Sequence, residues 1–298
     1  MPSSSNGATL RRIAAITFLV FASRGLAMPF LSLYVRSTGF TGTQIGTLIG
    51  VSSLVLLFSS PLVNTLADRT RQHRRLYYSL VITNIFALLG IASNLSQWFL
   101  AGSIIVRDSS DNPGAALLAQ LTVTWLDDQK RSIYGRLRAW GSLGWGVTTL
   151  ISGRLVAAGG YPFLFVLSAI LNLAVVPLIR VLPSNTAGKV VEQSAAAPRS
   201  RAFYIYLVGA FLFNFGASAV SVFSFLYFKE SLGASNELIG VLSSVAALSE
   251  IPAMILIDRV LKRTNIRTTL VIGMLGQAVL WVAYTVLTGP TVLIPLMV

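Results

Sequence analysis

The chain has 298 residues, of which 54% are hydrophobic and 11% charged, and its mean hydropathy of +0.72 excludes an ordinary soluble domain and predicts an integral membrane protein. With no cysteine and a single histidine, His73, the sequence excludes disulfides, thiolate chemistry and a zinc site, and we expect no metal and no cofactor. The formal net charge of +13 comes from short basic clusters between apolar runs, without a long basic face or a nucleic-acid-binding motif, so we expect no nucleic-acid partner.

The first apolar segment, residues 12–35, is longer than the apolar core of a signal peptide and contains Arg24. We interpret it as a retained span; a cleaved signal is the alternative, because small residues lie near Ala22. A membrane helix needs about 20 apolar residues to cross a hydrocarbon core of about 30 Å. Eight further segments are long enough: residues 44–67, 76–94, 98–126, 139–158, 162–182, 203–228, 236–258 and 268–287. Because the final residues, TVLIPLMV, only begin a tenth segment, we expect an all-α polytopic protein with about nine spans, truncated at its C-terminus.

Lysine and arginine gather on one side of these spans. Positively charged loops next to span ends are retained in the cytoplasm. If the N-terminus is cytoplasmic, 18 of the 23 basic residues fall on the cytoplasmic side, and only Arg36, Arg154 and Lys229 fall on the outer side. The sequence therefore predicts a protein of the cytoplasmic membrane, embedded in the lipid bilayer, with its N-terminus in the cytoplasm.

One long polar stretch, rich in small residues, follows the sixth span and indicates a linker at residues 184–202. We therefore predict an N-terminal half of six spans over residues 1–183 and an incomplete C-terminal half over residues 203–298. The two halves share a faint repeat at offsets of 190 to 194 residues. FLSLYVRSTGFTGTQIGTLIG matches FSFLYFKESLGASNELIGVLS, and PLVNTLADRTRQHRR matches PAMILIDRVLKRTNIR.

The segment LADRTRQHRR after the second span resembles the loop signature of major facilitator transporters, and part of it recurs six spans later. MPFLSLYV, YGRLRAWGSLGWG and LSEIPA are similar to the lactose-permease-like branch, which includes sugar, nucleoside and aromatic-acid proton symporters. The resemblance implies the major facilitator fold, here a six-helix N-terminal bundle with an incomplete C-terminal bundle. It also implies secondary transport, in which two halves rock about a site between them.

The loop signature contains Asp68 and Arg69 at the end of the second span, and the repeat places Asp258 and Arg259 at the end of the eighth. A carboxylate in this place can cap a neighbouring helix and pair with a nearby arginine, so we expect a latch that holds one conformation and breaks in the other. In the alternative interpretation the arginines are only cytoplasmic anchors of their spans.

In the sugar-transporting relatives, the pattern YGRLRAWGSLGW supplies an arginine and a tryptophan to the substrate site, and these are Arg138 and Trp145 here. A spacing of seven places both on one face of the fifth span together with Ser142, so a guanidinium can bind hydroxyls while an indole stacks on a ring. The acidic residue that the relatives carry 18 positions earlier falls on Gln120, which can bind substrate but cannot take up a proton. In the alternative, Arg138 anchors the helix end and Trp145 packs against its neighbours.

Charged residues interrupt the first and fourth spans: Arg24 in the first, and Arg107, Asp108 and Asp111 in the fourth. Such residues normally face a bundle interior or a water-filled cavity. The resemblance implies that the first, fourth and seventh spans line the cavity, which adds Asn214 of the seventh. We expect Asp111 to pair with Arg24 or Arg107, and Asp108, which is less well compensated, to carry the proton; Asp111 is a further candidate for proton coupling.

The sequence RDSSDNPG, residues 107–114, can also be interpreted as a turn. The span after it would then have 14 residues, about 21 Å, which is too short to cross the bilayer. We therefore predict one fourth helix that is kinked at Pro113.

Glu250 in the eighth span is a further candidate for proton coupling, or a structural partner of Arg154 or of a backbone donor. Together these residues indicate a proton-coupled secondary transporter of a small polar solute, either a sugar, a nucleoside or an aromatic acid. We expect no enzyme activity, although the pair of aspartates in the fourth span leaves a membrane enzyme as a rival interpretation. A second rival is a fragment that does not transport, or that needs a partner protein.

Overall fold

The computed structural model describes residues 4–130, 133–184, 201–286 and 295. At residues 4–6, 127–130, 202, 253, 255–263 and 266 only the course of the backbone is described. These parts of the chain are helical, and the predicted all-α class is confirmed. The elements are α1 (Ser4–Ser37), α2 (Gly42–Thr70), α3 (His73–Ser93), α4 (Gln97–Lys130), α5 (Tyr134–Val175), η2 (Val176–Val181), α6 (Arg201–Glu230), α7 (Asn236–Arg263) and α8 (Ile266–Val286).

Each of the nine predicted spans lies, to within one residue, in one of these helices, with α5 and η2 together containing two of them, and the helices extend up to eight residues beyond the predicted bounds. A straight helix over Tyr134–Val181 would be about 72 Å long, more than twice the bilayer core. The helix bends at Gly160, where φ is 74° and ψ is 177°, and Pro162 follows. Glycine adopts this φ without the clash that a Cβ would bring, so the bend lies where the sequence permits it. Each arm of α5 is then long enough for one crossing.

Six of the described helical segments are long and apolar enough to cross a membrane. They are Gly7–Ser37, Gly42–Thr70, His73–Ser93, Tyr134–Val181, Phe203–Glu230 and Arg267–Val286. Helix α4 has 34 residues, but it is not one of these six apolar helices, because charged and polar residues occupy its middle. The apolar pattern alone therefore does not account for the position of α4 inside the bundle.

Helix α4 is continuous through residues 107–114, so the interpretation of this stretch as a turn is wrong. Pro113 lies inside the helix, as predicted. The polar side chains that favour a turn in an isolated peptide are held here by neighbouring helices. Asp111, for example, accepts hydrogen bonds from α1 and α3.

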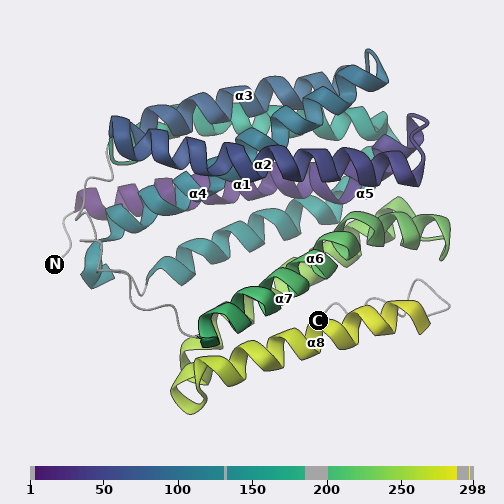
Figure 1. Cartoon of the computed structure of the whole chain (residues 1–298). Helices are drawn as coiled ribbons and strands as arrows, with labels where there is room; N and C mark the ends of the chain where they lie inside the picture. Colours follow the sequence, from purple (N-terminus) through teal and green to yellow (C-terminus); the bar gives the residue numbers. More distant parts are fainter. Residues whose placement is uncertain (1–3, 131–132, 185–200, 287–294, 296–298) are drawn as a thin grey trace.

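The helices lie side by side in two groups, α1 to α5 on one side and α6 to α8 on the other (Figure 1). Within the first group α1 packs along α5 and α3 along α4, whereas α5 also packs along α7 and so joins the groups. Two glycines permit this close approach. A Cβ at Gly153 of α5 would collide with the backbone of Asn236, and a Cβ at Gly240 of α7 would collide with the carbonyl oxygen of Thr149.

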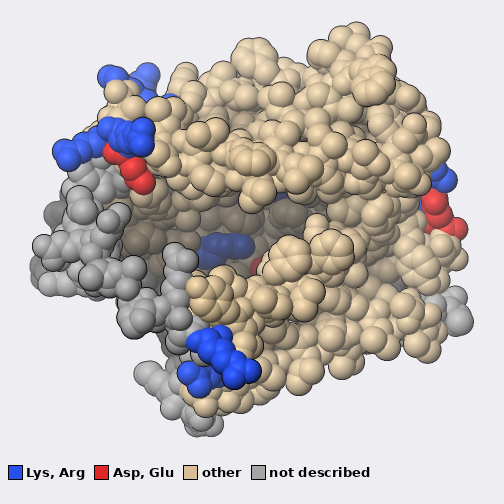
Figure 2. Space-filling view, viewed as in Figure 1, with Lys and Arg blue, Asp and Glu red and all other residues tan. Residues whose placement is uncertain are grey.

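The contacts between the two groups include an ion pair at one end of the bundle. There Arg36 Nε lies 2.8 Å from Glu230 Oε1, and the Tyr161 hydroxyl donates to Asn236 at 3.3 Å. At the opposite end the first turns of α6 are exposed, with Ile205 at 63%. Figure 2 shows a hollow between the two groups, with charged atoms visible inside it. The arrangement is therefore closed at the end that carries Arg36.

The predicted linker, residues 184–202, lies almost entirely outside the described residues. The two groups of helices meet along α5 and α7. The division of the chain into halves at 1–183 and 203–298 stays a prediction.

Candidate functional site

An ionic cluster joins α1 to α4 in the middle of the first group of helices. Arg24 Nη2 lies 2.9 Å from Asp111 Oδ2, and Arg24 Nε donates to Asp111 Oδ1 at 3.1 Å. The same guanidinium donates to the backbone carbonyl of Asp111 at 2.7 Å. The Asp111 side chain is 9% exposed and that of Arg24 15%. The contact expected between these two residues is therefore present, and it is shielded from solvent.

Arg107 connects the two aspartates of α4. Its Nη1 lies 2.9 Å from Asp108 Oδ1 and its Nη2 lies 3.2 Å from Asp111 Oδ2. Ser52 of α2 donates to Asp108 Oδ2 at 2.5 Å, and Asn84 of α3 donates to Asp111 Oδ1 at 3.1 Å. Two guanidinium groups thus face two carboxylates, and the cluster carries no net charge.

The two carboxylates differ in their surroundings. Asp111 accepts from two arginines and one amide, whereas Asp108 accepts from Arg107 and one hydroxyl. The Asp108 side chain is 19% exposed, about twice the value of Asp111. Asp108 is also the member of the pair that lines two cavities, as described next. Within the described residues, no group of three histidine, aspartate or glutamate side chains could hold a metal ion.

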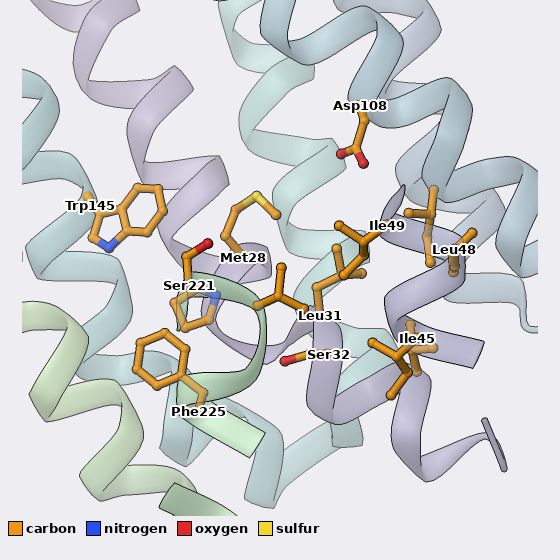
Figure 3. A pocket seen from close by; sticks show the side chains of 14 residues that line it. Met28, Leu31, Ser32, Ile45, Leu48, Ile49, Asp108, Trp145, Ser221 and Phe225 are labelled. Atoms are coloured by element: carbon orange, nitrogen blue, oxygen red, sulfur yellow. The ribbon is translucent and has the colours of Figure 1, made fainter. Parts of the chain in front are cut away.

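Two of the cavities meet at Asp108 and Trp145. The smaller cavity, about 230 Å³, includes the ionic cluster and reaches Ser52, and the larger, about 330 Å³, has mainly apolar walls from α1, α2 and α6. Figure 3 shows the larger cavity, with Trp145 and Phe225 on one side and Asp108 on the other. A molecule in this cavity would contact an indole, apolar side chains and one carboxylate.

A third cavity, about 290 Å³, lies between α5 and α7, where the two groups of helices face each other. Its walls include Arg138, Ser142, Trp145 and Glu250. The Ser142 hydroxyl donates to Glu250 Oε2 at 3.0 Å, and Trp145 Nε1 donates to the hydroxyl of Ser243 at 3.0 Å. The expected face of Arg138, Ser142 and Trp145 thus points toward the opposite group of helices.

Arg138, which lines this cavity, has one buried donor without a partner among the described residues. Its guanidinium carbon lies 4.3 Å from the centre of the Phe21 ring, which supports the charge from one side. Its Nη1 is buried and has no hydrogen-bond partner among the described residues. A buried guanidinium nitrogen without a partner is costly.

The structure does not bring every expected residue to these cavities. Gln120 is exposed on α4 and does not line the third cavity, which Arg138 lines. Asn214 is exposed on α6, and its amide donates to the carbonyl of Ala210, one turn earlier in the same helix. The partner of Glu250 is Ser142, which donates a hydrogen bond to it, and not Arg154.

The expected latch has a different partner from the one predicted. Asp68 Oδ1 lies 3.0 Å from Nε2 of His73, the first residue of α3, and within the described ranges no arginine forms an ion pair with it. No side chain caps the first turn of α3 at Gln72. Arg69 is exposed, and the side chains of Asp258 and Arg259 lie outside the described ones. The short turn between α2 and α3 places the histidine, not an arginine, against Asp68.

Several contacting residues were not predicted. Ser52 and Asn84 donate to the two aspartates, and Phe21 and Ser243 contact Arg138 and Trp145. An amide in the middle of the apolar third span is a usable signal for Asn84. The serines and Phe21 have no such signal, because similar residues occur throughout the spans.

The sequence model of the MFS_1 like family matches residues 10–298 of the chain. Maltose permease of Geobacillus stearothermophilus is 27% identical over 273 residues, which cover 90% of this chain and 68% of the permease. A protein of Escherichia coli (strain K12) named probable 3-phenylpropionic acid transporter is 25% identical over 278 residues, covering 91% of this chain and 73% of that protein. This chain thus spans roughly two thirds to three quarters of the length of these relatives.

A crystal structure of a variant of the nucleoside transporter NupG has a similar fold, with a TM-score of 0.73 at 18% identity over 97% of this chain and 78% of that chain. The major facilitator fold expected from the sequence is therefore confirmed. With the family match over nearly the whole sequence, the chain belongs to the MFS_1 like family of secondary transporters in the major facilitator superfamily.

Proposed function

We propose that the chain transports a small solute with a ring and an acceptor group, coupled to protons. One observation carries this proposal: Trp145 lines all three cavities, so it links the unused donor of Arg138 to the carboxylate of Asp108. A solute beside Trp145 can contact the donor on one side while Asp108 exchanges a proton on the other. No covalent bond of the solute has to change.

The apolar cavity favours an aromatic acid as the solute. Met28, Leu31 and Phe225 offer no hydrogen bonds to a ring that enters there, whereas Arg138 can bind a carboxylate. The relative named for 3-phenylpropionic acid agrees with this combination. A sugar is the second candidate, because Ser142, Ser243 and Glu250 could bind hydroxyl groups and another relative is a maltose permease.

Asp108 is the better candidate for the coupling proton. Asp111 is held by both arginines, and its protonation would leave a buried positive charge without a partner. Asp108 can change its charge at lower cost, since it contacts one arginine and lines two cavities. Glu250 can serve in addition, because it lies across the third cavity from Arg138.

The contacts at the Arg36 end and the hollow between the two groups of helices support an alternating mechanism in which this conformation is open at one end only (Figure 2). With the N-terminus in the cytoplasm, the open end faces the cytoplasm. Asp68 and Arg69, with Asp258 and Arg259 in the repeat, form the latch for the other conformation.

The test is solute transport by the purified chain in lipid vesicles. With an imposed pH gradient, wild-type protein should accumulate 3-phenylpropionate, and it should also exchange labelled for unlabelled solute without a gradient. Asp108→Asn should abolish accumulation and retain exchange. Glu237→Gln, which likewise replaces a carboxylate by an amide but at an exposed position, should retain both. Full accumulation by Asp108→Asn would remove Asp108 from the mechanism.

Two further measurements separate the alternatives. Unchanged pH dependence in Glu250→Gln would remove Glu250 from the coupling. If labelled maltose exchanges and labelled 3-phenylpropionate does not, the solute is a sugar and the apolar cavity does not bind its ring.

A further inference from the structure

A long apolar groove runs between α1 and the first arm of α5, apart from the three cavities around Trp145. Its volume is about 660 Å³, and its walls include Phe18 and Leu19 of α1 and Leu137 and Trp140 of α5. Neither the family match nor the proposed transport assigns a ligand to this groove.

The groove opens to the outside of the bundle. At about 100° per residue, Arg136 and Trp140 lie on the side of α5 opposite to Arg138 and Ser142, which face α7. Trp140 is 48% exposed. In a membrane this side of α5 meets lipid, so an acyl chain can enter the groove from the bilayer.

Two arginines mark one end of the groove. Arg11 of α1 and Arg136 of α5 both line it, and both are exposed. In the part of the chain that the structure describes, neither forms a hydrogen bond or an ion pair. Arg136 also lies in the first turn of α5, where the helix dipole adds positive potential. Among the described residues, the end of this apolar groove thus carries two arginines without an acidic partner.

We infer that this groove binds one anionic phospholipid, with an acyl chain along Phe18 and Trp140 and the phosphate between Arg11 and Arg136. Basic pockets between membrane helices recognise lipid headgroups through this combination of charge and apolar surface. A tryptophan at the groove also fits the headgroup level of a bilayer, where indole rings concentrate. Both arginines belong to the side of the protein that is predicted to be cytoplasmic, where anionic lipid would attract them.

The test uses dibrominated phosphatidylglycerol, whose bromine atoms quench nearby tryptophan fluorescence. The purified full chain in detergent is titrated with this lipid, and the signal of Trp140 is the difference between wild type and Trp140→Phe. We expect saturable quenching of Trp140. Each arginine near an anionic headgroup contributes about a fivefold change in affinity, so Arg11→Gln with Arg136→Gln should weaken binding about 30-fold.

Arg12→Gln is the matched control. Arg12 is exposed next to Arg11 and does not line the groove. Arg12→Gln removes one positive charge, as Arg11→Gln alone does, so it should bind as wild type does, whereas Arg11→Gln alone should bind about fivefold more weakly. All variants must elute from size-exclusion chromatography as wild type, since the changes lie at exposed positions. Equal quenching by dibrominated phosphatidylcholine, or unchanged affinity in the double variant, would overturn the proposal.

Discussion

The ionic cluster of α1 and α4 and the cavity between α5 and α7 both contain arginine and acidic side chains, but they neutralise charge differently. In the cluster, every charged group has an oppositely charged partner within 3.2 Å. In the cavity, Arg138 and Glu250 line opposite walls without an ion pair, and Arg138 Nη1 has no partner among the described residues.

This difference follows from which helices carry the charges. The members of the cluster belong to one group of helices, so their contacts can persist while the two groups move against each other. The cavity residues come from both groups, and a contact between them would have to break in each cycle. Paired charges therefore stabilise the first group of helices, whereas Arg138 and Glu250, which belong to different groups, line the third cavity without an ion pair between them.

The largest expected effect comes from breaking the cluster. Asp111→Asn leaves Arg24 and Arg107 with one carboxylate between them, and loss of one partner of a buried pair costs about 3–5 kcal/mol. Thermal unfolding in detergent should show a clear fall in the midpoint. Combining Asp111→Asn with Arg24→Gln should recover part of the loss, because the charges balance again. An unchanged midpoint in the single variant would mean that the cluster does not stabilise the half.

Removing the unused donor should affect solute binding more than stability. Arg138→Gln loses a charged hydrogen bond worth about 2–3 kcal/mol, which weakens solute affinity roughly 30- to 150-fold. Exchange transport over a range of solute concentrations measures this change. Arg138→Lys keeps the charge but loses the planar fork, so it should recover only part of the affinity. Wild-type affinity in Arg138→Gln would contradict the assignment of this cavity to the solute.

Packing between the groups can be tested at Gly240. The added Cβ of Gly240→Ala would meet the Thr149 carbonyl oxygen, and such overpacking costs about 1–3 kcal/mol. Gly209→Ala in α6 is the control, because no atom lies within 4 Å of the added group. The unfolding midpoint should fall in Gly240→Ala and stay constant or rise in Gly209→Ala. Equal midpoints in both variants would indicate that α5 and α7 separate without cost.

The smallest effect is expected at the exposed ion pair between the groups. Arg36 and Glu230 are 42% and 46% exposed, and such pairs contribute about 0–1 kcal/mol. Arg36→Gln should leave the unfolding midpoint within 1–2 °C of wild type, roughly the span of such small energies. Since the chain has no cysteine, Arg36→Cys with Glu230→Cys gives a clean cross-linking test of this closed end. Failure to cross-link in any condition would contradict the closed arrangement.

The sequence predicts the helices well because most spans are long apolar runs, and the bend at Gly160 coincides with a Gly-Gly-Tyr-Pro stretch. The contact between Arg24 and Asp111 could also be predicted, since charges at similar depth in a bilayer must find partners. These features depend on position along the chain and on the cost of burying a charge. Both can be judged from the sequence without knowing which face each helix turns toward its neighbours.

Features that depend on helix rotation could not be predicted. Gln120 and Asn214 lie on cavity-lining spans by resemblance, yet their side chains are exposed and outside the cavities described around Trp145. Ser52 became a partner of Asp108 only because α2 packs along α4. A polar residue in a span is a sign of a site, but the face it occupies is set by packing with other helices.

The polar centre of α4 has a consequence for how the protein is made. Arginine and aspartate at the middle of a span each oppose insertion by about 2.5–3.5 kcal/mol, so α4 is a poor membrane helix when it leaves the ribosome alone. Its partners Arg24, Ser52 and Asn84 belong to α1, α2 and α3, which are synthesised first. The order of the helices along the chain therefore lets the earlier spans receive α4 as it enters the bilayer, and its biogenesis depends on them.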